Sequence, residues 1–173
     1  GIARAQDKLL TLDELYDPTR GVNFNGRPPT GLRWLADGTA YLQTKFDPPT
    51  LALQLLKVDG LTGTAAPFFD AAKMEAAFAA LPGLSRDAAR EIAHLPTYQM
   101  NPAQTAALIN YANDLFYYQF GSSSALRLTL SPDAEVGEEF SPDARMVSFV
   151  RNNNLYIVEV ATARERALTS DGA

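Results

Sequence analysis

The chain has 173 residues, of which 46% are hydrophobic, and its formal net charge is −5. This length fits a single globular unit, and an acidic chain without a basic stripe is a poor partner for nucleic acid or for an anionic membrane surface. No apolar run approaches the length of a membrane span. The absence of cysteine fits a cytoplasmic protein and equally an exported protein without disulfides.

The two ends of the chain suggest export and a longer parent protein. Ala3-Arg4-Ala5 is an A-x-A triplet of the kind after which signal peptidase cleaves, so we expect a periplasmic or secreted protein with its cleavage site after Ala5. The alternative is that the triplet arises by chance, since the chain is rich in alanine. At the other end, Ala173 stands where a further repeat would begin, so we expect a fragment of something longer.

The first strand-like segment follows a short helix. Thr11-Leu12-Asp13-Glu14 is a capping box, which predicts a helix over 11–17 that ends before Pro18. Short apolar runs over 32–69, interrupted by a proline-rich loop, then predict a first blade of strands. We regard this blade as a weaker copy of the repeat described below.

Residues 70–95 change to a helical pattern. Asp70 and Ser85 are good N-capping residues, and apolar side chains recur at helical spacing after each of them. Pro96 ends the second helix. This segment predicts a helical pair inserted between the first and second blades, packed against the outside of the blades or over one end.

The rest of the chain contains two copies of one repeat, over 97–130 and 140–169. Met100-Asn101-Pro102 precedes Phe140-Ser141-Pro142 by 40 residues. The same offset matches Ile109 with Phe149, Asn113 with Asn153, Leu115 with Leu155, Phe116 with Tyr156, Leu128 with Leu168 and Thr129 with Thr169. A period of about 40–45 residues with short strands is typical of propeller blades.

These segments predict a mainly β fold: a partial β-propeller of about three blades of antiparallel strands, with the helical pair inserted around residues 70–95. A propeller needs roughly 4–8 blades to close. We therefore expect exposed blade faces that either associate with a second copy, giving a homo-oligomer, or stay partly uncovered.

Two segments could be taken for parts of a nucleophilic site. His94 is the only histidine, so any Ser-His-Asp triad would have to use it, but the end of a helix favours a histidine for structural reasons alone. Gly121-Ser122-Ser123-Ser124-Ala125 approaches the G-x-S-x-G elbow, but it lacks the closing glycine and joins two strands rather than a strand and a helix. We interpret it as a hairpin loop.

The charged candidates are also weak. Arg27 and Arg33 could bind an anion, although solvated surface or a local ion pair explains them as well. Glu138 and Glu139 could hold a cationic amine, but neighbours in a strand point to opposite faces, so we reject the pair as a site. With one histidine and no cysteine, a zinc site is not expected. We predict no catalytic, metal or cofactor residue in this chain, and we leave substrate-binding residues unassigned.

Several motifs occur in a distinctive order. They are Leu10-Thr11-Leu12-Asp13-Glu14-Leu15, Leu32-Arg33-Trp34-Leu35-Ala36-Asp37 and Tyr41-Leu42, then Phe140-Ser141-Pro142-Asp143, Val147-Ser148-Phe149-Val150, Asn153-Asn154-Leu155-Tyr156 and Ala167-Leu168-Thr169. This order resembles the start of the extracytoplasmic part of the dipeptidyl peptidase IV family, in the prolyl oligopeptidase clan. The resemblance covers most of the chain outside the helical pair.

The resemblance implies a large serine exopeptidase that releases dipeptides from N-termini, with Pro or Ala preferred in the second position. An eight-bladed propeller would be followed by an α/β-hydrolase domain with the Ser-Asp-His triad. In the family a Glu-Glu pair in an Asp-Trp-x-x-Glu-Glu context holds the substrate amine. Glu138-Glu139 lacks that context, so we do not transfer the role. The family's substrate-contacting arginine has no counterpart in Asn110-Tyr111-Ala112.

Three hypotheses follow. The first is the non-catalytic N-terminal propeller part of an exported serine dipeptidyl peptidase, with the downstream hydrolase domain and a peptide substrate as its partners. The second is a stand-alone periplasmic propeller that acts as a binding or scaffold protein. The third, a lactonase-like propeller with a central metal, would require inward carboxylates and histidines that the sequence does not offer.

Overall fold

The computed structural model describes residues 11, 16, 31–49 and 51–172. The predicted helix over 11–17 therefore lies outside the described residues apart from Thr11 and Tyr16, and so do Ala5 and Arg27. Contacts between Cα atoms divide the chain into residues 1–30 and 31–173. The β-sheets of the described residues lie in the second unit.

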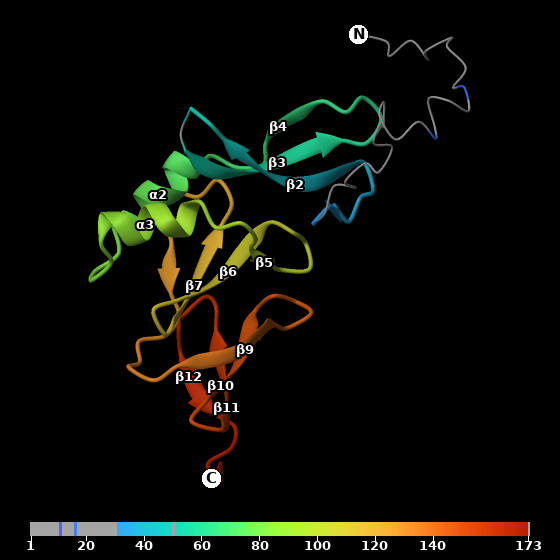
Figure 1. Ribbon diagram of the computed structural model, residues 1–173. Coiled ribbons are helices and arrows are strands. Elements are labelled where there is room, and N and C mark those ends of the chain that lie inside the picture. Colours follow the sequence, from blue (N-terminus) through green and yellow to red (C-terminus); the bar gives the residue numbers. More distant parts are fainter. Residues whose placement is uncertain (1–10, 12–15, 17–30, 50, 173) are drawn as a thin grey trace. The chain divides into compact units, whose positions relative to one another are not determined.

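Three antiparallel sheets of four strands each form the β part of this unit (Figure 1), and in each sheet the strands are paired in chain order. The strands are β1 (Arg33–Trp34), β2 (Ala40–Asp47), β3 (Ala52–Asp59) and β4 (Ala65–Pro67); β5 (Gln99–Met100), β6 (Ala106–Tyr111), β7 (Asp114–Gln119) and β8 (Leu126–Arg127); and β9 (Glu135–Phe140), β10 (Met146–Arg151), β11 (Asn154–Glu159) and β12 (Glu165–Ala167). The predicted mainly β fold, a partial propeller, is confirmed.

Two helices lie in the chain between the first and second sheets, α2 (Ala71–Ala79) and α3 (Arg86–Ala93). Asp70 caps α2, since its Oδ1 accepts from the backbone N–H of Lys73 at 3.0 Å. Ser85 caps α3 in the same way, with its Oγ accepting from Ala88 at 3.1 Å. The inserted helical pair is therefore confirmed.

The central hairpins of the second and third sheets repeat one design residue for residue. An offset of 40 carries β6 onto β10 and β7 onto β11 with the same bounds. Both hairpins turn on two residues in the left-handed region, Ala112-Asn113 and Asn152-Asn153. Positive φ at both central residues defines a type I′ turn, whose twist matches that of the flanking strands.

The turn between the first and second strands is shared by all three sheets. Its closing hydrogen bonds run from Leu35 N to Ala40 O (2.9 Å), from Asn101 N to Ala106 O (3.0 Å) and from Ser141 N to Met146 O (2.9 Å). Gly38, Gln104 and Ala144 occupy the same left-handed position, with φ of 68°, 57° and 58°. The first sheet is therefore built on the same plan, although its sequence matches less well.

The first sheet differs in the length of its central hairpin. Strands β2 and β3 have eight residues each, whereas the corresponding strands of the other sheets have six. The hairpin tip leaves large apolar side chains in solvent: Phe46 is 58% exposed and Leu51 is 78% exposed. This extension, like the helical pair, is a departure from the repeat.

The second sheet is buried on both faces. One face carries Leu108, Leu115 and Leu128, which pack against Val147, Phe149 and Val158 of the third sheet. The other carries Ala107, Ile109, Phe116 and Tyr118, which pack against Met74, Phe78 and Ile92 of the helical pair. We expected the helices outside the blades or over one end. Instead they cover one face of the second sheet, because their apolar side chains pack against it. The rings of Phe78 in α2 and Phe116 in β7, for example, have centroids 5.9 Å apart.

The third sheet begins earlier than the range 140–169 taken from the sequence. Strand β9 pairs with β10 from Glu135 to Phe140, and the register shifts between Ser148 and Val150. Gly137 lies at this bulge with φ of 66°, a conformation that glycine adopts at little cost. Glu138 and Glu139 consequently lie within a strand of the blade and not ahead of it.

Candidate functional site

His94 takes a structural position at the C-terminus of α3. Its Nδ1 lies 3.1 Å from the carbonyl oxygen of Leu53 in β3. A carbonyl can only accept, so Nδ1 carries a proton in this contact. The bond ties the helical pair to the first sheet. In the described part of the chain, this histidine is bonded to backbone and not to a serine hydroxyl.

The serine-rich segment forms the loop between β7 and β8. The hydroxyls of Ser122 and Ser124 lie 3.4 Å apart, and Ser122 Oγ accepts from the N–H of Ser124 at 3.1 Å. The Ser122 carbonyl accepts from the hydroxyl of Tyr118 at 2.9 Å. The polar groups of this loop are therefore bonded within the loop and to the strand before it. None of these contacts places a general base beside a serine hydroxyl.

The two adjacent glutamates have different surroundings. Glu138 accepts from Nδ2 of Asn110 at 3.2 Å, and its backbone carbonyl accepts from Nε2 of Gln99 at 2.8 Å. Glu139 is exposed, and its side chain has no hydrogen bond or ion pair among the described residues. Only Glu138 is therefore engaged, in a contact between the second and third sheets. Arg33 lies on β1 beside Leu42 and Leu55.

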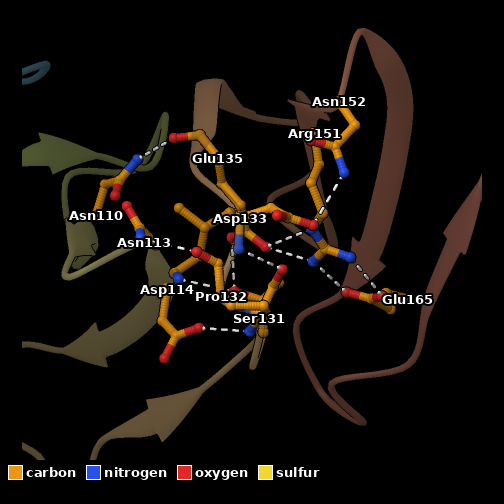
Figure 2. Close-up of polar contacts among 12 residues, drawn as sticks. Asn110, Asn113, Asp114, Ser131, Pro132, Asp133, Glu135, Arg151, Asn152 and Glu165 are labelled. Atoms are coloured by element: carbon orange, nitrogen blue, oxygen red, sulfur yellow. Dashed lines mark hydrogen bonds and ion pairs between the residues drawn. The ribbon is translucent and has the colours of Figure 1, made fainter. Parts of the chain in front are cut away.

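A buried ion cluster, which the sequence analysis missed, lies at the junction of the second and third sheets (Figure 2). Arg151 of β10 donates from Nε to Glu135 Oε1 at 3.1 Å, and its Nη2 donates to the same oxygen. It also binds Glu165 of β12, with Nη1 to Oε1 at 2.9 Å and Nη2 to Oε2 at 2.8 Å. The guanidinium lies over Phe149 and Tyr156, 5.2 and 4.9 Å from the ring centroids.

The cluster is continuous with hydrogen bonds to the second sheet. The Thr129 hydroxyl donates to Glu135 Oε2 at 2.6 Å and accepts from Leu115 N at 2.8 Å. Asn110 Nδ2 donates to the Glu135 carbonyl at 2.7 Å. Figure 2 also shows Asn152 reaching Asp133 in the segment between the two sheets. The cluster therefore binds three strands of one sheet and ties that sheet to its neighbour.

Burial dominates the electrostatics of Glu135, whose side chain is fully buried. Removal from water raises the pKa of this carboxyl above its usual range, and the bonds from Thr129 and Arg151 only partly offset that rise. The bonds to Glu165 and Glu135 raise the pKa of Arg151. The guanidinium donors of Arg151 are bonded to the carboxylates of Glu135 and Glu165. We therefore interpret the cluster as a structural contact between strands rather than as a catalytic group.

A second candidate is a cleft between the β2–β3 hairpin and the helical pair. It has a volume of about 790 Å³. Its lining is Asp47, Ala52, Leu53, Gln54, Pro67, Phe69, Asp70, Ala71, Ala72, Glu75, Arg90 and His94. The cleft thus combines an apolar floor with charges of both signs, which is the usual composition of a small-molecule site.

Within 31–49 and 51–172, no group of three or more His, Asp or Glu side chains is placed to hold a metal ion. In the same part of the chain, no helix is both long and apolar enough to cross a membrane.

Comparison with known proteins finds similarities both to a family model and to solved structures. Residues 110–173 match the family model of the dipeptidyl peptidase IV (DPP IV) N-terminal region. The chain is similar in structure to dipeptidyl peptidase 4 of Porphyromonas gingivalis, with 22% identity and a TM-score of 0.53 over 96% of this chain and 22% of that one. TolB of Acinetobacter baumannii aligns at 16% identity with a TM-score of 0.43, over 83% of this chain and 33% of that one.

The resemblance drawn from the sequence motifs is confirmed: the chain is similar to the N-terminal region of a DPP IV-like protein. At 22% identity, the structural similarity to the Porphyromonas protein concerns the fold alone. The chain spans 22% of the length of the Porphyromonas protein.

Proposed function

We propose that this chain is the non-catalytic N-terminal propeller part of an exported serine dipeptidyl peptidase. The α/β-hydrolase domain with the catalytic triad would lie downstream and act on the N-termini of peptides. The family match over 110–173 and the fold of the Porphyromonas enzyme support this proposal. Export is inferred from the A-x-A triplet that ends at Ala5.

The observation that carries the proposal is an uncovered face of the third sheet. In the second sheet, Leu115 and Leu128 are 0% and 2% exposed, because the third sheet covers them. Their counterparts 40 residues later, Leu155 and Leu168, are 38% and 44% exposed. A further sheet of the same design would bury them. The repeat is therefore suited to continue towards a larger ring.

The contacts between sheets also indicate where the ring axis would lie. Gln99 of β5 bonds to the backbone of β9 at 2.8 Å. Gln104, in the turn after β5, accepts from Ala36 N at 2.6 Å and donates to the carbonyl of Trp34 in β1 at 3.2 Å. Neighbouring sheets are thus bridged at their first strands. Because propeller blades surround a central channel, we place that channel on the side of β1, β5 and β9.

Peptidase assays test the proposal directly. We expect no turnover of Gly-Pro or Ala-Pro chromogenic amides by this chain alone. The protein encoded with the sequence downstream of Ala173 should cleave them and should be blocked by a serine-directed inhibitor. Inhibitor-sensitive turnover by this chain alone would contradict the proposal. A downstream sequence with further blades and no hydrolase elbow would favour the scaffold hypothesis instead.

A further inference from the structure

We propose that the cleft between the β2–β3 hairpin and the helical pair binds a small zwitterion with an apolar body, such as a short peptide. The proposal does not rest on the peptidase assignment, because every lining residue belongs to this chain. It assigns a binding role to the two segments that depart from the repeat, the long hairpin and the inserted helices.

The size of the cleft suits such a ligand. Its volume of about 790 Å³ falls within the roughly 300–1,000 Å³ of typical small-molecule sites. One wall is the end of the hairpin, with Leu53 and Gln54 of β3, and the other is formed by α2 and α3. His94 fixes the two walls together through its bond to the Leu53 carbonyl. The cleft is therefore largely formed before any ligand arrives.

The floor of the cleft is apolar and held in place by aromatic packing. Leu53, Pro67 and Phe69 contribute to it. The Phe69 ring stacks on Phe120 with centroids 5.2 Å apart and meets the edge of Tyr98 at 5.5 Å. A ring with two such neighbours has little freedom to collapse into the cleft. It offers a firm surface to an aliphatic side chain.

Two opposite charges in the lining have no partner within the described part of the chain. Glu75 of α2 and Arg90 of α3 both line the cleft. Among the described residues, neither side chain has a hydrogen bond or an ion pair, with each other or with any third group. A ligand with an ammonium group for Glu75 and a carboxylate for Arg90 would satisfy both charges, and charge-assisted hydrogen bonds are the strong ones.

Other polar groups add to this pattern. Asp70 also lines the cleft, and its carboxylate adds a negative charge to that of Glu75. That balance favours the ammonium end of the ligand most. His94 also lines the cleft, with its Nδ1 already bonded to the Leu53 carbonyl. These features favour a peptide with a free N-terminus over a simple fatty acid or an anion.

Calorimetric titration of the full 173-residue chain tests this proposal. The probe is the tripeptide Leu-Ala-Leu, compared with its N-acetylated form and its C-terminally amidated form. We expect the free tripeptide to bind and each capped form to bind about tenfold more weakly, the loss expected for one charge-assisted hydrogen bond. No binding of the free tripeptide at millimolar concentration, or equal affinity for all three forms, would overturn the proposal.

Two variants assign each end of the ligand. In Glu75→Gln, N-acetylation should no longer weaken binding while amidation still does; in Arg90→Gln the pattern should reverse. Glu139→Gln and Arg166→Gln are matched controls, because both side chains are exposed, lie outside the cleft and have no hydrogen bond or ion pair among the described residues. If the cleft variants and the control variants changed peptide binding equally, only the overall charge of the chain would matter. That outcome would overturn the proposed site.

Discussion

Arg151 donates from Nε to Oε1 of Glu135 at 3.1 Å, and the two side chains are only 10% and 0% exposed. The pair joins β10 to β9, and Glu165 extends it to β12. Charges this far from water are favourable only when they are fully paired and hydrogen-bonded. The third sheet therefore depends on this contact.

Arg151→Met is expected to destabilise the chain by roughly 3–5 kcal/mol, because it leaves the buried Glu135 carboxylate without its cation. Urea unfolding followed by circular dichroism measures the loss. Arg166→Met is the matched control: Arg166 lies one residue from Glu165 on β12, but it is exposed, so a change of less than about 0.5 kcal/mol is expected. Equal losses in both variants would show that the cluster has no special role.

The repeat was readable from the sequence because turns and strands kept one spacing. Asn113 and Asn153 mark the same hairpin position, and both adopt positive φ. Strand β9 was missed because Gly137 and two glutamates lack the apolar alternation of a strand. Its pairing is set by the bulge and by contacts such as Gln99 to the Glu138 carbonyl, which no local pattern reveals.

The turn between β3 and β4 is expected to make a pH-dependent contribution to the free energy of unfolding. The pKa of Asp59 is lowered because its carboxylate accepts from the Thr62 N–H, the Thr62 hydroxyl and the Leu61 N–H. The bonds favour the charged form, so their stabilisation is present above the ordinary pKa of 3.8 and is lost as the pH falls through the lower folded-state value.

Asp59→Asn should therefore be less stable than the wild type at pH 7, and the gap should close as the pH falls below 3.8. Urea unfolding at several pH values measures it. Asp171→Asn is the control, since no hydrogen bond or ion pair of that side chain occurs among the described residues. A gap that stays constant from pH 7 to pH 3 would rule out the carboxylate as its source.

The contrast between equivalent leucines gives a third prediction. Leu115→Ala should cost about 2–5 kcal/mol, because it opens a cavity between two sheets. Leu155→Ala, at the same position of the next sheet but 38% exposed, should cost less than about 1 kcal/mol. Urea unfolding of both variants measures the difference. Similar losses would mean that the face of the third sheet is already covered in this chain.

The same face should drive association. Leu155 and Leu168 expose apolar surface that a blade normally hides, so we expect this chain to form dimers or larger species at micromolar concentration. Leu155→Ser combined with Leu168→Ser should shift sedimentation towards the monomer. The matched control is Leu61→Ser, which removes a 98% exposed leucine from a turn of the first sheet. A wild-type chain that sediments as a monomer with little dye binding would contradict the prediction.

The candidate sites were less predictable than the fold. Glu135 and Arg151 lie 16 residues apart, and their pairing depends on how β9 bends back to β10. Glu75 and Arg90 come from different helices, and the cleft that they line lies where the β2–β3 hairpin meets the helical pair, next to the His94 bond. The residue types along the chain do not indicate pairings between such distant side chains, whereas the 40-residue repeat predicted the sheets.

A close contact between Trp34 and Gly60 gives the last prediction. A Cβ atom at Gly60 would lie 3.2 Å from the Trp34 ring and 3.2 Å from the Thr39 carbonyl. The backbone oxygen cannot easily yield, so Gly60→Ala should destabilise the first sheet by about 1–3 kcal/mol through overpacking. Because Trp34 is the single tryptophan, its fluorescence should shift as the ring moves. Ala66→Val adds carbon atoms to an exposed residue of β4 and should change neither signal. Unaltered emission in Gly60→Ala would show that the ring does not rest on this glycine.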